Sequence, residues 1–341
     1  MTPAATRFPR PLVAGDRIAV TSPSSGVPSE SIPRLEFNLR WLRDRGFEVV
    51  VGECMSGDLV RSAPKEQRAA ELVELLCDPA VAAVVPPFGG ELAIDLLDQL
   101  DWDRLAAADP TWLVGWSDIS TLMVALTTRL GWATAHGWNL MDTALAPPAG
   151  LLHWTDLLAT TGEVVQRSPG RTRDDWGDHR APETTEMTLD RPTDWVVLDG
   201  SDVDVSGRLV GGCLEVLGPL AATPYADVAA YGRAHADEGL LVYLEACEFG
   251  AYDACRIFHG LRYAGWFEHA NAVLIGRTPA PDAEDLSQLE AVEDALGDLG
   301  IPVVAEMDIG HTQPFLPLVN GAIARVVVRD GVREVTQTLG S

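Results

Sequence analysis

Three residues of types suited to hydrolysis lie at the ends of apolar runs that are typical of buried strands. Ser117 comes two residues after Gly115, which closes one such run, and an amphipathic segment follows it. Glu245 closes a second run, and His311 lies in a loop after a third. If the three meet, the imidazole can accept the hydroxyl proton while the carboxylate holds the imidazole's tautomer. The chain therefore contains the parts of a serine hydrolase.

Each of these residues also has a simpler interpretation. Ser117 precedes a helical pattern, and serine is a common N-cap. The G-x-S-x-G pattern of a nucleophile turn is incomplete, because Ile119 replaces its second glycine. Glu245 could be a solvated strand-end carboxylate. Cys213 is a rival nucleophile, because it follows two glycines at a predicted helix start, although buried cysteines are usually inert.

Two further sites could bind a ligand. Gly89 and Gly90 separate a strand predicted at 81–86 from a helix predicted at 92–100, so a bound group could approach the backbone there. We favour a ligand over a simple turn, because ligands of open α/β sheets bind beyond the carboxyl ends of the strands. Trp176 lies within a polar run, where it either anchors a loop or offers a surface on which a ligand stacks.

Composition excludes several classes of protein. With 25 basic and 50 acidic residues the formal charge is -25, which disfavours nucleic acid and anionic membranes as partners. Five scattered cysteines without C-x-x-C indicate thiols in a reducing compartment, and no signal-peptide pattern is seen, so we expect a cytoplasmic protein. Neither H-E-x-x-H nor a P-loop motif occurs, and we expect no metal site and no cofactor.

The order of apolar and amphipathic segments predicts an α/β fold with two domains. Residues 1–150 alternate strand and helix as a flavodoxin-like or Rossmann-like parallel sheet requires. Residues 151–206 break this rhythm and are predicted to be a linker and active-site loop. Residues 207–341 are predicted to form a smaller C-terminal α/β domain that carries Glu245 and His311.

Seven segments together resemble the LD-carboxypeptidase family of serine peptidases, family S66, and within it the microcin C self-immunity branch. They occur in the family's order and span nearly the whole chain. The segments are GDRIAVTSPSSG at 15–26, RSAPKEQRAAEL at 61–72, Gly89-Gly90, GWSDIS at 115–120, GRLVGGCLEVL at 207–217, VYLEACE at 242–248 and GHTQPFLPLVNGA at 310–322.

This resemblance implies a role for particular residues. Ser117 would be the nucleophile, Glu245 the acid of the triad and His311 the general base, in a cleft between an α/β domain and a swivelling, barrel-like domain. The backbone N–H groups of Gly90 and Asp118 would hold the oxyanion. Family members are commonly homodimers and need no metal.

The resemblance also implies two possible substrates. At two positions this chain departs from the pattern that is frequent in the family. The amide would be either the L,D bond of a murein tetrapeptide or the aspartyl-nucleotide bond of a microcin C-like peptidyl-nucleotide, and an arginine would pair a substrate carboxylate. The loop near Trp176 is where the microcin branch contacts a nucleotide. Ala246 replaces a frequent aspartate and Cys213 a frequent asparagine. Two alternatives stay open: a catalytically silent protein that binds such ligands, and chemistry through Cys213.

Overall fold

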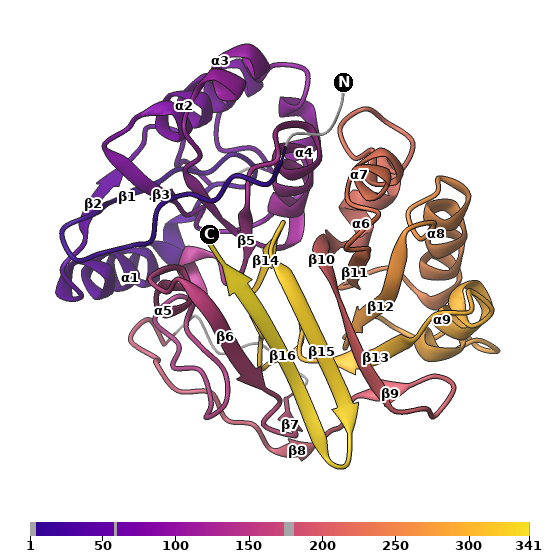
Figure 1. The fold of residues 1–341 in the computed structure, drawn as a ribbon. Coiled ribbons are helices and arrows are strands. Elements are labelled where there is room, and N and C mark those ends of the chain that lie inside the picture. The colour runs from indigo at the N-terminus through magenta and orange to yellow at the C-terminus, as the bar shows by residue number, and fades with distance from the viewer. Residues whose placement is uncertain (1–4, 58–59, 174–180, 341) are drawn as a thin grey trace.

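A computed structural model describes residues 5–57, 60–173 and 181–340 and shows two large sheets side by side (Figure 1). The first sheet has the order β14-β5-β4-β3-β1-β2, and β1 to β5 run parallel. Its strands are β1 (Arg17–Val20), β2 (Glu48–Val51), β3 (Val81–Val84), β4 (Trp112–Gly115), β5 (Thr134–His136) and β14 (Leu318–Asn320). The order 2-1-3-4-5 is that of flavodoxin-like doubly wound folds, so the predicted fold class is confirmed.

The helices of the N-terminal half, which contains strands β1 to β5, are amphipathic, with one exception. They are α1 (Ile32–Asp44), α2 (Lys65–Cys77), α3 (Trp102–Ala107) and α4 (Ser120–Leu130). In α4 every residue except Arg129 is buried. The reason is its position, because α4 contacts β5 of the first sheet and β10 of the second. The helix that follows Ser117 is therefore wedged between the two halves of the molecule.

One predicted helix of this half is wrong. The segment 92–100 forms only a short 3-10 helix, η2 (Ala93–Leu96), followed by turns. Two carbonyls of this segment accept side-chain hydrogen bonds. Leu92 O accepts one from Arg68 at 3.4 Å, and Leu97 O accepts one from the Trp102 indole at 2.8 Å. Tertiary contacts have overridden the local apolar pattern.

The second sheet has eight strands in the order β6-β16-β15-β10-β11-β12-β13-β9. Its strands are β6 (Gly162–Arg167), β9 (Val196–Val197), β10 (Val203–Cys213), β11 (Leu240–Glu245), β12 (Ala270–Gly276), β13 (Val303–Met307), β15 (Ile323–Arg329) and β16 (Val332–Leu339). Strands β10 to β13 are parallel and the outer pairs are antiparallel. The helices of this half are α6 (Leu214–Leu217), α7 (Val228–Ala234), α8 (Ala251–Tyr263) and α9 (Gln288–Leu296). The carboxyl ends of β10 and β11 therefore lie next to each other.

One strand of the C-terminal part of the chain belongs to the first sheet. Strand β14 comes from the C-terminal part of the chain but pairs with β5 of the first sheet. The interval 151–206 supplies α5 (Trp154–Leu158), edge strands β6 and β9, and a two-stranded ribbon of β7 (Arg171–Thr172) and β8 (Arg191–Pro192). The boundaries of the domains at 150 and 206 stay a prediction.

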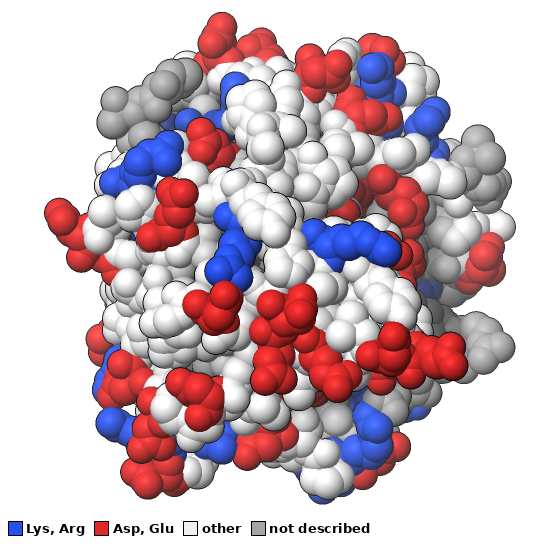
Figure 2. Space-filling model, turned by 90° about the vertical axis from the view of Figure 1, so that its right-hand side faces the viewer, with Lys and Arg blue, Asp and Glu red and all other residues white. Residues whose placement is uncertain are grey.

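Acidic side chains dominate the face that carries α8 and α9 (Figure 2). None of the helices in the described ranges has the length and apolar character that a membrane span requires. The cytoplasmic location stays a prediction.

Candidate active site

Ser117 lies in a strained turn between β4 and α4. The turn is a 3-10 helix, η3 (Ser117–Ile119), whose N-cap is Trp116, so Ser117 is not the cap residue. Its φ of 58° falls in the left-handed region, which a residue with a Cβ rarely adopts. Gly89 packs against it so closely that a Cβ there would lie 2.7 Å from the Ser117 Cβ. A sharp turn of this kind presents the hydroxyl above the sheet.

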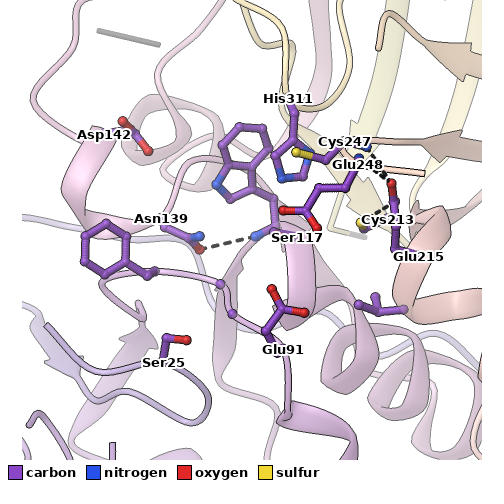
Figure 3. A pocket seen from close by; sticks show the side chains of 15 residues that line it. Ser25, Glu91, Ser117, Asn139, Asp142, Cys213, Glu215, Cys247, Glu248 and His311 are labelled. Carbon is purple, nitrogen blue, oxygen red and sulfur yellow. Dashed lines mark hydrogen bonds between the residues drawn. The ribbon is translucent and has the colours of Figure 1, made fainter. Parts of the chain in front are cut away.

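Ser117 and His311 line one cleft between the two halves, with a volume of about 410 Å³ (Figure 3). The N-terminal half contributes the residues around Ser25, the Gly89-Gly90 turn, Ser117, Asn139 and Asp142. The C-terminal half contributes residues from the ends of β10 and β11 and His311. The complete lining is Ser25, Phe88, Gly89, Gly90, Glu91, Trp116, Ser117, Asn139, Asp142, Cys213, Glu215, Val216, Cys247, Glu248 and His311.

Glu245 and His311 form a buried acid–imidazole pair. His311 Nδ1 lies 2.6 Å from Glu245 Oε2, and the two residues are 9% and 1% exposed. Gly310 permits this contact, because its φ is 93° and a Cβ would lie 2.5 Å from Glu245 Oε2.

The electrostatics of the pair favour charge on both members. Burial raises the pKa of Glu245, but His311 and His136 together outweigh burial and lower it to about 2. Burial lowers the pKa of His311, but the Glu245 charge, with a smaller effect of the Cys247 side chain, raises it well above its ordinary value. His311 is therefore a stronger base than a histidine with the ordinary pKa.

Trp116 orients the imidazole, and sequence reasoning missed it. Its ring stacks on that of His311, with centroids 4.4 Å apart and an angle of 21° between the planes. Phe315 packs edge-on against Trp116 at 5.1 Å. Trp116 precedes Ser117 directly, so the strand that delivers the hydroxyl also fixes the plane of the histidine ring. An aromatic residue adjacent to the serine was the only signal in the sequence.

Asp118 supports the Gly89-Gly90 loop through its side chain. Its carboxylate accepts hydrogen bonds from Ser24 Oγ at 2.5 Å and from the backbone N–H of Ala93 at 2.7 Å. Gly90 in turn lies against Ser24 and Ser25, where a Cβ would come within 2.4 Å of each hydroxyl oxygen. Ser24 and Ser25, which belong to the segment at 15–26, therefore hold in place the loop that carries the backbone N–H of Gly90.

His136 lies beside Glu245 and is not part of the described lining of the cleft. It is fully buried at the end of β5, and its Nε2 is 3.8 Å from Glu245 Oε1. Neither ring nitrogen of His136 nor Glu245 Oε1 has a hydrogen-bond partner among the described residues. Buried polar groups without partners are costly, and a small movement would pair these two. Burial lowers the pKa of His136, so the ring is neutral and has one N–H to donate.

We expect His136→Phe to lower kcat about tenfold and to move the acid limb of kcat/KM to higher pH. The aromatic ring preserves packing against Tyr243 and Phe315, whose ring centroids lie 5.2 and 5.3 Å away. It cannot donate to Glu245, so the carboxylate charge acts on His311 alone and the pKa of His311 rises. His136→Gln, which keeps an N–H donor, should restore part of the rate. An unchanged acid limb in a well-folded His136→Phe protein would show that His136 only packs.

Cys213 is a poor nucleophile in this setting. Burial, followed by the charges of Glu245 and Glu215, raises the pKa of its thiol well above the ordinary value, so the thiolate is disfavoured. The thiol donates to Glu215 Oε2 at 3.1 Å. Glu215 Oε1 accepts the backbone N–H groups of Cys247 and Glu248 at 2.7 and 2.9 Å. Glu215 thus ties the loop after β11 to the start of α6.

Two predicted substrate contacts are not observed. Trp176 lies outside the described residues. The described lining of the cleft includes neither lysine nor arginine, although the sequence analysis requires an arginine for a substrate carboxylate. It includes instead four carboxylates, those of Glu91, Asp142, Glu215 and Glu248.

Two family models define the class of protein. One for the N-terminal domain of LD-carboxypeptidases matches residues 18–137, and one for the C-terminal domain matches residues 206–326. The chain therefore belongs to the LD-carboxypeptidase family, S66, and it is a carboxypeptidase of this family.

Individual relatives cover nearly the whole chain. SCO6489 of Streptomyces coelicolor is 33% identical over 93% of this chain and 92% of its own length. The murein tetrapeptide carboxypeptidase of Pseudomonas aeruginosa is 27% identical over 86% and 88%. Microcin C7 self-immunity protein MccF of Escherichia coli is 23% identical over 89% and 88%. A solved structure of MccF in complex with glutamyl sulfamoyl guanosine matches with a TM-score of 0.82, at 22% identity, over 100% of this chain and 99% of that chain.

Proposed function

We propose that this enzyme is a serine carboxypeptidase in which Ser117, His311 and Glu245 form the triad. Ser117 Oγ attacks the carbonyl carbon of the scissile amide while His311 accepts the hydroxyl proton. His311 then returns this proton to the leaving amine, and the C–N bond breaks. Water, deprotonated by the same imidazole, hydrolyses the acyl-enzyme and regenerates Ser117. Glu245 holds the imidazole and stabilises its charged form.

The oxyanion of each tetrahedral intermediate would be held by the backbone N–H groups of Gly90 and Asp118. Gly90 belongs to the loop that packs against Ser117, and Asp118 follows Ser117 in the chain. The hydrogen bond from Ser24 to the Asp118 carboxylate and the contact of Ser24 with Gly90 hold these two segments together. Donors fixed before the reaction stabilise developing charge without reorganisation. The observation that carries the proposal is the 2.6 Å acid–imidazole pair in a cleft that Ser117 also lines.

The charges of the cleft favour a murein-type peptide as substrate. The lining carboxylates of Glu91, Glu215 and Glu248 repel the acidic groups of either substrate, the aspartyl carboxylate or the terminal carboxylate of a tetrapeptide, because like charges repel in a partly desolvated site. The side chain of diaminopimelate also carries an ammonium group, which these carboxylates attract. The proposed reaction is therefore release of the terminal D-Ala from a murein tetrapeptide. MccF binds nucleotide-linked aminoacyl analogues, and the relationship to MccF makes a peptidyl-nucleotide the second candidate.

A mass-spectrometric release assay tests both candidates. The protein is incubated with a diaminopimelate-containing murein tetrapeptide and, separately, with an aspartyl-adenylate analogue, and each product is quantified over time. Release of D-Ala at the higher kcat/KM supports the murein proposal, and faster cleavage of the nucleotide conjugate contradicts it. Ligand binding without release, together with no labelling by a fluorophosphonate, would identify a silent binding protein instead.

The pH dependence of kcat/KM should have an acid limb above pH 6.5, the ordinary pKa of histidine. The base must be neutral to accept the proton of Ser117, and Glu245 raises the pKa of His311. Activity is therefore expected to fall as pH decreases through this raised pKa and to be fully developed above it. A profile measured on the wild-type protein with the faster of the two substrates checks this. An acid limb at or below pH 6.5 would mean that Glu245 does not control His311.

A further inference from the structure

The triad pair shares its site with a thiol. One ligand atom from each of Cys213, Glu245 and His311 lies within 4.8 Å of the other two, and all three residues are buried. Parallel pairing explains this, because Cys213 of β10 and Glu245 of β11 are in register at the ends of neighbouring strands. Figure 3 shows Cys213 and His311 on the C-terminal side of the cleft.

These three side chains form a set of donors that suits a metal ion. Thiolate sulfur, imidazole nitrogen and carboxylate oxygen are the ligands that Zn²⁺ prefers, and thiolate selects softer divalent ions over Mg²⁺ or Ca²⁺. Glu245 Oε1 is buried and without a hydrogen-bond partner among the described residues, so an acceptor atom is available beside this set.

The surroundings also favour a cation. A second thiol, that of Cys247, interacts with His311. The carboxylates of Glu91, Glu215 and Glu248 line the cleft, and its described lining includes neither lysine nor arginine. A divalent ion that enters the cleft would therefore gain both ligands and a favourable field.

We propose that Cys213, Glu245 and His311 bind a thiophilic divalent cation such as Zn²⁺, and that the bound ion switches off the hydrolase; this regulation rests on the proposed function. A bond forms between the metal and Cys213 Sγ, and the thiol proton leaves to solvent. If the ion binds His311 Nε2, it takes the lone pair that would accept the Ser117 proton, and the Nε2 proton of a charged ring leaves to solvent. If it binds Nδ1, a charged ring loses its Nδ1 proton to solvent and a neutral ring moves that proton to Nε2. In both cases the imidazole loses its role as base, with no change in oxidation state.

A second cluster of the same chemistry provides a matched control. Cys255, His259 and Asp294 also hold ligand atoms within 4.8 Å of one another, between α8 and α9, but none of them is buried. His259 Nε2 lies 3.0 Å from Asp294 Oδ2. An exposed cluster keeps its ligands solvated and mobile, so we expect weaker binding there than in the cleft.

Cobalt titration tests the assignment without relying on activity. Co²⁺ replaces Zn²⁺ in such sites, and a bound thiolate gives a charge-transfer absorption band. Metal-free wild type, Cys213→Ser, Cys247→Ser and Cys255→Ser are titrated with Co²⁺, and thermal melting confirms that each is folded. We expect the high-affinity band in wild type, Cys247→Ser and Cys255→Ser, and its loss in Cys213→Ser. In parallel, the Zn²⁺ concentration that halves hydrolysis should rise at least tenfold in Cys213→Ser.

Other outcomes separate this inference from the proposed function. Retention of the band in Cys213→Ser, or its loss only in Cys247→Ser or Cys255→Ser, overturns the ligand set. An active wild-type protein that Zn²⁺ does not inhibit overturns the regulation. If metal-free wild type shows the expected bands but hydrolyses neither substrate, the metal site stands and the proposed hydrolase function fails.

Discussion

Replacement of Ser117 by alanine is expected to lower kcat by roughly 10⁴- to 10⁶-fold, the range observed when a serine nucleophile is removed. Without the hydroxyl no acyl-enzyme forms, and the remaining oxyanion donors can only assist direct attack by water. KM should change little, because Ser117 contributes one small side chain to a cleft of about 410 Å³. The measurement is release of the terminal residue under single-turnover and steady-state conditions.

The control is Ser201→Ala, which removes a hydroxyl from an exposed turn outside the described cleft lining and should leave kcat unchanged. A fluorophosphonate should add its mass to wild type and to Ser201→Ala, but not to Ser117→Ala. Hydrolysis by Ser117→Ala at the wild-type rate would end the proposed mechanism and direct attention to Cys213.

Replacement of Glu245 by glutamine is expected to lower kcat by roughly 10⁴-fold, as loss of the acid does in other triads. The amide is isosteric but cannot hold the imidazole in the required tautomer or stabilise its charge. The pKa of His311 should fall, because the carboxylate that raises it is lost. The residual activity should therefore persist to lower pH than in wild type. This shift is opposite to the one expected for His136→Phe.

Glu306→Gln is the matched control. Glu306 is a second glutamate on a parallel strand of the same sheet, β13, which β12 separates from β11, and it does not line the cleft. Its replacement should leave the pH profile and kcat within a few-fold of wild type. Comparison of kcat/KM against pH for the three proteins tests the assignment. An acid limb that stays in place in Glu245→Gln would show that His311 is not paired with Glu245 during catalysis.

The amino-acid sequence by itself determined the type and order of most elements. Alternating apolar and amphipathic segments identify β1 to β5 and the helices α1, α2 and α4, because burial on both faces of a parallel sheet demands continuous apolar strands. Strand ends also mark Ser117, Glu245 and His311 as candidates, since parallel strands place their carboxyl ends at one edge. The helix at 92–100 was predicted wrongly because its carbonyls bind side chains outside it, that of Arg68, which is distant in the chain, and that of Trp102, five positions beyond Leu97.

Only the tertiary structure decided which candidates meet. Glu245 and His311 lie 66 positions apart, and a periodic pattern contains no information on pairing at that separation. The stacking of Trp116 on His311, the position of His136 beside Glu245 and the convergence of Cys213 on the pair all depend on the register of neighbouring strands and on the packing of the two halves. Local residue preferences act over a few positions, whereas the chemistry of this site arises from contacts between segments distant in the chain.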